Sequence, residues 1–257
     1  MTNQCRVVFL VVAVIALLAS GCAGAKPSRE LHVAAAANLT KALDELDRAF
    51  QEESGIVVVP TYGATAQLAQ QIENGAPIDL FLAADTTHVD QLIAKGVAQP
   101  GSQAVYARGR LAIWAPQRAD ISSLQDLASP GVKTIGCARP ELAPYGAAAV
   151  QALRRAGLWE KVDPKLVYAQ SISAAKQFAD SGNAAASFTA LSLVILAGGH
   201  RVDVDQKLYD PIDQAMCIVK ASAYPGESQR FRDFLLGTAA AEIFIKYGYA
   251  KPEPTGR

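Results

Sequence analysis

The stretch Val33-Ala-Ala-Ala-Ala-Asn-Leu-Thr40 passes from an apolar strand directly into a helix. Apolar residues recur from its end at spacings of three and four, as in an amphipathic helix: Leu39, Ala42, Leu43, Leu46, Ala49 and Phe50. Asn38 stands where strand gives way to helix, and the sequence predicts that it caps the helix. A helix start leaves about four backbone N–H groups without partners and carries a partial positive charge. We therefore interpret this stretch as an anion site built from backbone.

The alternation of strand and helix continues along the chain. Strands are predicted at Leu31–Ala36, at Ile56–Val59, where Pro60 ends the strand, and at Ile78–Ala83. Helical patterns with short links lie between them. This alternation favours an α/β fold with largely parallel sheets and right-handed crossovers.

Two apolar strands, Leu111–Ala115 and Met216–Val219, flank a middle block of strands and helices. We interpret them as hinge strands that cross between two lobes, so that the chain leaves lobe 1 for lobe 2 and then returns. On this division residues 31–110 and 221–257 form lobe 1, and residues 111–220 form lobe 2. The division rests partly on the family resemblance given below. It implies a cleft between the lobes, a layout suited to closure on a ligand.

The first residues have the pattern of a targeting segment. Arg6 precedes an unbroken apolar run, Val7–Ala19, which is short for a membrane span and typical of a signal-peptide core. The small residues before Cys22 resemble a lipobox, in which this cysteine is lipidated. We interpret residues 1–21 as a signal peptide and residues 22–30 as a tether at the membrane surface. An ordinary secretory signal cleaved nearby is the alternative, and both place the mature protein outside the cytoplasm.

Composition and charge disfavour several classes of function. The chain has 257 residues, enough for two small domains with real cores. Lys+Arg and Asp+Glu both number 24, so no basic excess is available for nucleic acid. The 3 His and 4 Cys show no metal-ligand spacing. For Cys137 and Cys217, two buried free thiols are favoured over a disulfide, which an exported protein would allow.

Four helix starts are the candidate binding loops: Ala37-Asn38, Ala64-Thr65, Tyr145-Gly146 and Ser171-Ile172. Each follows a strand by a few residues, and ligands of open α/β sheets collect at the carboxyl ends of strands. Asn38 and Thr65 add side-chain donors, whereas Ile172 offers only its backbone N–H. Tyr145 adds a phenolic O–H. A simpler alternative stays open for each, because Asn, Thr and Ser at helix starts are often only caps and a tyrosine in a proline loop is often a surface residue.

Two rival classes of function are a hydrolase and a cytoplasmic ligand sensor. The candidate nucleophiles and bases of a hydrolase are Ser171, Ser173, Ser187, His32, His88 and His200. No G-x-S-x-G motif is present, and the histidines have no obvious acidic partner in the sequence. A sensor domain from a transcription regulator is disfavoured by the signal segment and by the lack of a helix-turn-helix region.

A set of motifs spans most of the mature chain: Ala34-Ala-Ala-Ala-Asn-Leu39, Gly63-Ala-Thr-Ala-Gln-Leu68, Gly75-Ala-Pro-Ile-Asp-Leu-Phe-Leu-Ala-Ala-Asp85, Pro140-Glu-Leu-Ala-Pro-Tyr-Gly146, Ala190-Leu-Ser192 and the tail from Phe231 to Tyr249. In this order and at these separations the motifs resemble the molybdate-binding proteins of ABC-type molybdate importers. The resemblance implies an α/β, two-lobed periplasmic-binding-protein fold of type II. Such a fold has two mixed sheets flanked by helices, two hinge strands and a ligand cleft between the lobes.

The resemblance also implies a set of site residues. Ala37 and Asn38 match the donors of the first loop, Thr65 the second, Tyr145 the third and Ile172 the fourth. These neutral donors would hold an oxyanion between the lobes, with molybdenum present only inside that oxyanion and without direct protein ligands.

Three departures from the family pattern bear on the site. Many members have Ser where this chain has Asn38 and Thr65. Members with a Tyr near Ala190 use it as a donor, a role that the resemblance gives here to Tyr145. Arg139 stands where some members have Asn, and it either adds a charge to the site or points to solvent.

The chemistry of the ligand suits a pocket of neutral donors. Molybdate is a proton-free dianion at neutral pH, whereas phosphate keeps a proton and would want an acceptor in the site. Sulfate is proton-free but smaller, and it is the alternative ligand. Tungstate is too similar in size to molybdate to be separated by sequence. The implied protein is a monomer without a cofactor or enzymatic activity that delivers its ligand to an ABC permease.

Overall fold

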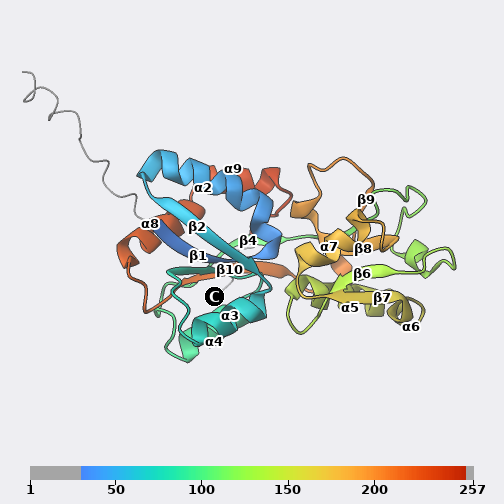
Figure 1. The fold of residues 1–257 in the computed structure, drawn as a ribbon, viewed down its shortest axis with the longest axis horizontal. Coiled ribbons are helices and arrows are strands. Elements are labelled where there is room, and N and C mark those ends of the chain that lie inside the picture. The colour runs from blue at the N-terminus through green and yellow to red at the C-terminus, as the bar shows by residue number, and fades with distance from the viewer. Residues whose placement is uncertain (1–29, 253–257) are drawn as a thin grey trace, which may run out of the picture.

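The computed structural model describes residues 30–252 and arranges them as two lobes side by side (Figure 1). Each lobe is built on a five-stranded sheet. The predicted signal peptide, the lipidation site Cys22 and the tether up to residue 29 lie outside the described residues. Glu30 already belongs to the first strand. Within residues 30–252, no helix is long and apolar enough to cross a membrane.

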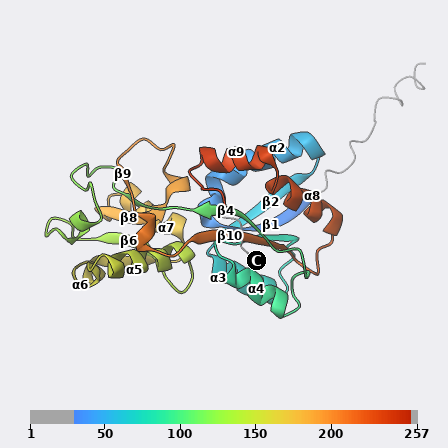
Figure 2. The same cartoon turned by 180° about the vertical axis from the view of Figure 1, so that it is seen from behind.

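The first lobe contains the beginning and the end of the described chain. Its strands are β1 (Glu30–Ala36), β2 (Val57–Gly63), β3 (Leu80–Leu82), β4 (Ala104–Gly109) and β10 (Ile212–Ile218). Its helices are the 3-10 turn η2 (Ala37–Leu39), α2 (Thr40–Ser54), α3 (Thr65–Glu73), α4 (Thr87–Ala94), α8 (Pro225–Leu235) and α9 (Thr238–Lys246). Helices α2, α8 and α9 lie on one side of the sheet, and α3 and α4 lie on the other (Figure 2). Their apolar side chains form two separate clusters with the strands.

The second lobe is formed by the middle of the chain. Its strands are β5 (Leu111–Trp114), β6 (Ile135–Ala138), β7 (Leu166–Ala169), β8 (Ala186–Ala190) and β9 (Arg201–Asp203). Its helices are η3 (Gln125–Ala128), α5 (Pro144–Arg155), α6 (Trp159–Val162), η4 (Asp163–Lys165), α7 (Ile172–Asp180), η5 (Leu191–Leu193) and η6 (Gln206–Leu208).

The two sheets share one topology. The strand order is β2-β1-β3-β10-β4 in the first and β7-β6-β8-β5-β9 in the second. In each sheet the first three strands pair in parallel and the last two join in antiparallel pairing. The expected α/β architecture with two mixed sheets is therefore confirmed.

Both predicted hinge strands lie inside a sheet instead of crossing between the lobes. β5 pairs only within the second sheet, with β8 and β9. Met216–Ile218 of β10 pairs with β3 of the first sheet, in register with Leu80–Leu82. The chain therefore crosses after Gly109 and again just before Ile212, and the prediction that placed residues 212–220 in lobe 2 is wrong. An apolar run does not reveal which of two sheets takes it up, because a central strand in either is buried on both faces.

Two element boundaries also differ from expectation. β2 runs through Pro60, which pairs with Val33 of β1. β2 is an edge strand, where a missing backbone N–H is tolerated, so proline does not end it. Helix α5 starts at Pro144, just before the predicted helix start at Tyr145-Gly146. Proline is favourable in the first turn because its fixed φ suits a helix and its missing N–H has no intrahelical acceptor.

Candidate functional site

The four predicted helix starts lie where the lobes meet. The N–H of Ala66, in the first turn of α3, donates to the carbonyl oxygen of Leu142 in the second lobe at 3.2 Å. The side chain of Gln67 donates to Gln170, the residue before the cap of α7, at 3.1 Å. η2 and α7 are also in contact. The lobes are thus closed on each other at the ends where these helices begin.

All five predicted site residues are buried in this interface. Ala37 and Ile172 are 3% exposed, and Asn38, Thr65 and Tyr145 are 1% exposed. Ala37, Tyr145 and Ile172 belong to one apolar cluster, although Ala37 comes from the first lobe and the other two from the second. Asn38 follows Ala37, and Thr65 is tied to this cluster through its hydrogen bond with Ala84. The structure therefore brings the five residues into one region.

Three of these residues occupy the first turns of their helices. Thr65 and Ile172 are the first residues of α3 and α7, and Tyr145 is the second of α5. Backbone N–H groups in a first turn have no intrahelical acceptor. The Ser171 side chain caps α7 by accepting from the N–H of Ala174 at 3.3 Å, as the simpler alternative for this residue has it. This bond does not use the N–H of Ile172.

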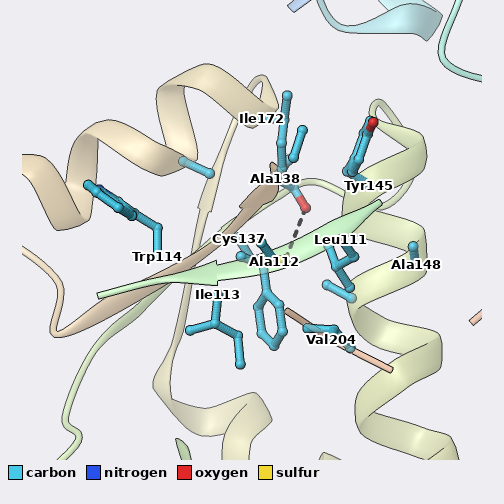
Figure 3. Packing of buried hydrophobic residues seen from close by; sticks show 14 of the residues in the cluster. Leu111, Ala112, Ile113, Trp114, Cys137, Ala138, Tyr145, Ala148, Ile172 and Val204 are labelled. Atoms are coloured by element: carbon cyan, nitrogen blue, oxygen red, sulfur yellow. Dashed lines mark hydrogen bonds between the residues drawn. The ribbon is translucent and has the colours of Figure 1, made fainter. Parts of the chain in front are cut away.

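Tyr145 presents a donor that no protein group uses. Its hydroxyl oxygen is buried and has no hydrogen-bond partner. Burial raises the pKa of this phenol well above its ordinary value, so the hydroxyl keeps its proton and remains a donor. Figure 3 shows the ring at one end of the second-lobe cluster, with its oxygen directed away from the side chains of Leu111, Ile113 and Val204. An orphaned buried hydroxyl is costly, which favours an acceptor supplied by a ligand.

Thr65 holds its hydroxyl toward the same interface. Its Oγ1 accepts from the N–H of Ala84 at 3.2 Å. Because the oxygen is the acceptor in this bond, the hydroxyl hydrogen remains available for another acceptor. The prediction of a side-chain donor at Thr65 is consistent with this geometry.

Asn38 does not cap a helix, and that prediction is wrong. It lies within η2, and its Nδ2 donates to Oε1 of Gln214 at 2.7 Å and to the hydroxyl of Tyr249 at 2.8 Å. Both amide hydrogens are consumed within the protein, so the side chain has none left for an anion. Its Oδ1 is buried without a partner. The donors left on this loop are backbone N–H groups.

Gln214, Tyr249 and Ser192 are residues of the site region that sequence reasoning missed. The Nε2 of Gln214 donates to the carbonyl oxygens of Ile212 at 3.0 Å and Ala84 at 3.4 Å. Tyr249 and Ser192 both donate to the carbonyl oxygen of Asn38, at 3.0 and 2.8 Å. One polar network therefore holds the η2 loop and the loop after β3. Gln214 could have been noticed in the sequence, because it is a polar residue next to the apolar run of β10.

The charged side chains of Arg139 and Asp79 lie outside this region. The Arg139 side chain is 45% exposed, and its Nη1 lies 3.6 Å from Oε1 of Glu141. Of the two roles considered for Arg139, the structure therefore supports a side chain that points to solvent. Among residues 30–252, Asp79 is the least exposed charged residue, at 4%. It accepts from the N–H of His32 and from Ser222 at the opposite end of β3. An anion bound between the helix starts would meet neutral donors and the positive ends of helix dipoles.

The structure has one cavity between the lobes and one within the first lobe, and none of the five predicted site residues lines either of them. One of about 270 Å³ lies between the lobes and is lined by residues that include Asp85, Leu142 and Pro144. Another, of about 580 Å³, lies in the first lobe around Ile78 and Val219.

Three of the residues considered for other chemistry are His88, Cys137 and Cys217. His88 does have an acidic partner, contrary to expectation: its Nδ1 lies 2.8 Å from Asp85, whose hydrogen bond raises the pKa of the imidazole. Cys137 and Cys217 are free and buried, one in each sheet. Burial raises the pKa of both thiols to about 12. Within the described chain, no group of three or more His, Cys, Asp or Glu is placed to hold a metal ion.

Two sheet-based lobes that close over facing helix starts define a class of protein that binds small solutes between its lobes. Residues 31–250 match the family of bacterial extracellular solute-binding proteins. The molybdate-binding protein ModA of Rhodobacter capsulatus is 38% identical over 221 residues, which cover 86% of this chain and 88% of the relative. ModA of Azotobacter vinelandii is 38% identical over 242 residues, 92% of this chain and 96% of the relative.

The solved structure of the Azotobacter vinelandii periplasmic molybdate-binding protein superimposes with a TM-score of 0.84 at 32% identity, covering 87% of this chain and all of that one. The chain therefore belongs to the bacterial extracellular solute-binding proteins and, within them, to the family of molybdate-binding proteins. Members of this family are transport proteins that work outside the cytoplasm and carry a transported ligand; they are not enzymes. The resemblance expected from the motifs is confirmed.

Proposed function

We propose that the protein captures molybdate, and also tungstate, outside the cytoplasm and delivers it to an ABC permease. The names and overall similarity of its relatives support molybdate. Tungstate follows from chemistry, because the two tetrahedral dianions have the same charge and nearly the same size. The protein needs no cofactor for this role, and molybdenum meets it only inside the oxyanion.

The observation that carries the proposal is the buried hydroxyl of Tyr145, which lacks an acceptor. We assign it to an oxygen of the bound oxyanion. The hydroxyl of Thr65 and the backbone N–H groups of Ala37, Asn38 and Ile172 supply the remaining donors. The Asn38 side chain has a different role in this proposal, since its amide hydrogens hold Gln214 and Tyr249.

A site of this composition suits a fully deprotonated dianion. Each hydrogen bond to a charged acceptor contributes about 1.5–3 kcal/mol, and first-turn N–H groups add the favourable field of the helix dipole. The least exposed carboxylate, that of Asp79, does not compete with the anion, because it lies at the other end of β3. Burial also excludes water, which strengthens each of these bonds.

Sulfate and hydrogen phosphate are the competing ligands. Sulfate is also proton-free, so only the size of the closed site discriminates against it. Hydrogen phosphate carries a proton, and the buried Oδ1 of Asn38 is an acceptor without a partner. Because this oxygen could accept the proton of hydrogen phosphate in a hydrogen bond, phosphate should compete with molybdate more strongly than sulfate does.

Calorimetric titration of the purified protein with molybdate, tungstate, sulfate and phosphate tests the proposal. We expect tight, similar binding of the first two anions and binding at least about a hundredfold weaker for the others, a difference of roughly 2.7 kcal/mol or more. Equal affinity for sulfate or phosphate would contradict the assigned ligand.

We propose further that Cys22 carries a lipid that anchors the protein as a monomer at the outer face of the cell membrane. The apolar run and small residues before Cys22 support this. Replacement Cys22→Ala should move the protein from the membrane fraction to the soluble fraction after cell lysis. An unchanged distribution would favour a cleaved secretory signal instead, and size-exclusion chromatography tests the monomer.

A further inference from the structure

Gly109 lies at the point where the chain leaves the first lobe. It is the last residue of β4, and β5 of the second sheet begins at Leu111. Its backbone is outside the left-handed region that favours glycine, so its conformation alone does not require this residue type. A reason for glycine must lie in what surrounds it.

The Tyr145 hydroxyl fills the space that a side chain at position 109 would need. A Cβ built on Gly109 would overlap the hydroxyl oxygen, and it would lie 2.8 Å from Cζ of the same ring and 3.1 Å from Nε2 of Gln214. Real Cβ atoms essentially never approach another heavy atom within 3.0 Å. Gly109 belongs to the first lobe and Tyr145 to the second, so this close approach joins the two lobes.

Neither neighbour can easily make room for a methyl group. Tyr145 sits in the first turn of α5, which packs closely on the end of β6: a Cβ built on the next residue, Gly146, would overlap the carbonyl oxygen of Ala138. Gln214 is held by hydrogen bonds to Asn38, Ile212 and Ala84. A side chain at position 109 would therefore be relieved by a turn of the Tyr145 ring or by separation of the lobes.

We propose that Gly109 is a positioning residue for the oxyanion site: by lacking a side chain it lets the lobes close until the Tyr145 hydroxyl reaches the ligand. This inference rests on the proposed function, in which that hydroxyl is a donor. The absence of one methyl group thus sets the position of a donor that belongs to the opposite lobe. When the lobes are separated, a side chain at position 109 would not contact Tyr145. The effect of Gly109→Ala should therefore appear in the affinity for the ligand.

The test is a double-mutant cycle on the full chain, with calorimetric titration of molybdate. Gly109→Ala should weaken binding at least tenfold when Tyr145 is present. In the Tyr145→Ala background the same change should alter affinity less than about twofold, because the overlapping hydroxyl and ring are gone. Equal losses in the two backgrounds, or no loss in the first, would overturn the inference.

Gly226→Ala is the matched control. Gly226 also has a backbone outside the left-handed region, and a Cβ there would meet nothing within 4 Å. This variant should bind molybdate like the natural protein, and a tenfold loss there would overturn the reading of the Gly109 result. If Gly109→Ala does not fold alone, the double variant with Tyr145→Ala should fold, and its failure to fold would contradict the overlap as the cause.

Closure itself provides a second readout. Small-angle X-ray scattering should show that molybdate compacts the natural protein, whereas Gly109→Ala stays more extended at saturating molybdate. Equal compaction would overturn the inference. If the natural protein did not bind molybdate at all, the proposed function itself would be wrong. Failure of the Gly109 inference and failure of the proposed function are therefore distinguishable.

Discussion

The hydroxyl of Tyr249 is hydrogen-bonded twice to Asn38: it accepts from the side-chain Nδ2 at 2.8 Å and donates to the carbonyl oxygen at 3.0 Å. The two residues are 211 positions apart, so the end of the described chain fixes the loop that follows its first strand. Tyr249 is 4% exposed and Asn38 is 1% exposed. Buried hydrogen bonds of this kind fix a loop in one geometry.

Tyr249→Phe should lower the free energy of unfolding by about 1–3 kcal/mol and weaken molybdate binding several-fold. The ring is kept, so the loss comes from the two hydrogen bonds to Asn38, while Gln214 and Ser192 still hold that residue. Urea denaturation and calorimetry measure the two effects. Tyr247→Phe is the control, because its hydroxyl bonds only to Glu45 near the surface; a similar loss in both variants would refute the special role of Tyr249.

Asn38→Ala should destabilise the protein by about 1–3 kcal/mol as well as weaken binding, because it leaves Oε1 of Gln214 buried without its donor. The sequence alone led to a different expectation, in which the Asn38 side chain donates to the ligand. Asn38→Asp should reduce molybdate binding further, since a buried carboxylate would face an anion. Thermal unfolding measures the stability of both variants, and calorimetric titration measures their affinity for molybdate. Unchanged stability of Asn38→Ala would contradict the structural role of this side chain.

Tyr145→Phe should separate binding from stability. It removes a buried hydroxyl that has no protein acceptor, so the ligand-free variant should be as stable as the natural protein or slightly more stable. Molybdate binding should weaken by about tenfold to a hundredfold, the worth of one hydrogen bond to a charged acceptor. Calorimetry and thermal unfolding without ligand measure the two quantities. A large loss of stability would mean that the hydroxyl has a structural partner.

Asp47 should make stability depend on pH. Its Oδ1 is buried without a partner, and burial, followed by repulsion from Asp44, raises the pKa of its carboxyl group to about 8. The folded state therefore holds a proton that the unfolded state releases near pH 4. The stabilisation from this proton is complete below the unfolded pKa and is lost as pH rises toward 8, with a slope of at most about 1.4 kcal/mol per pH unit.

Asp47→Asn isolates this effect. The amide cannot ionise, so the free energy of unfolding should change less between pH 5 and pH 8 than in the natural protein. Urea denaturation at both pH values provides the comparison. Identical pH profiles for the two proteins would show that Asp47 titrates normally.

Much of the fold could be predicted because it depends on local patterns. The spacing of Leu43, Leu46 and Phe50 predicted α2, and these side chains pack on the first sheet as an amphipathic helix should. The predictions were wrong where the position of a strand in its sheet determines the structure. Pro60 is tolerated because β2 lies at an edge of the sheet, and the sequence around Met216 does not specify which sheet β10 joins.

The candidate site was predictable at the level of its loops and less so at the level of individual side chains. Helix starts after strands indicated Thr65, Tyr145 and Ile172, and all three are buried where the lobes meet. The roles of Gln214 and Tyr249 depend on contacts across 176 and 211 residues. No spacing rule connects residues so distant, so the hydrogen bonds that hold Asn38 were invisible before the structure.

The most direct measurement is a crystal structure of the protein with molybdate bound. Our account predicts the anion between the lobes, with the hydroxyl oxygens of Tyr145 and Thr65 and the backbone nitrogens of Asn38 and Ile172 within about 3.2 Å of its oxygens. Molybdate bound elsewhere, for example in the cavity beside Asp85, or bound without contact to the Tyr145 hydroxyl, would contradict it.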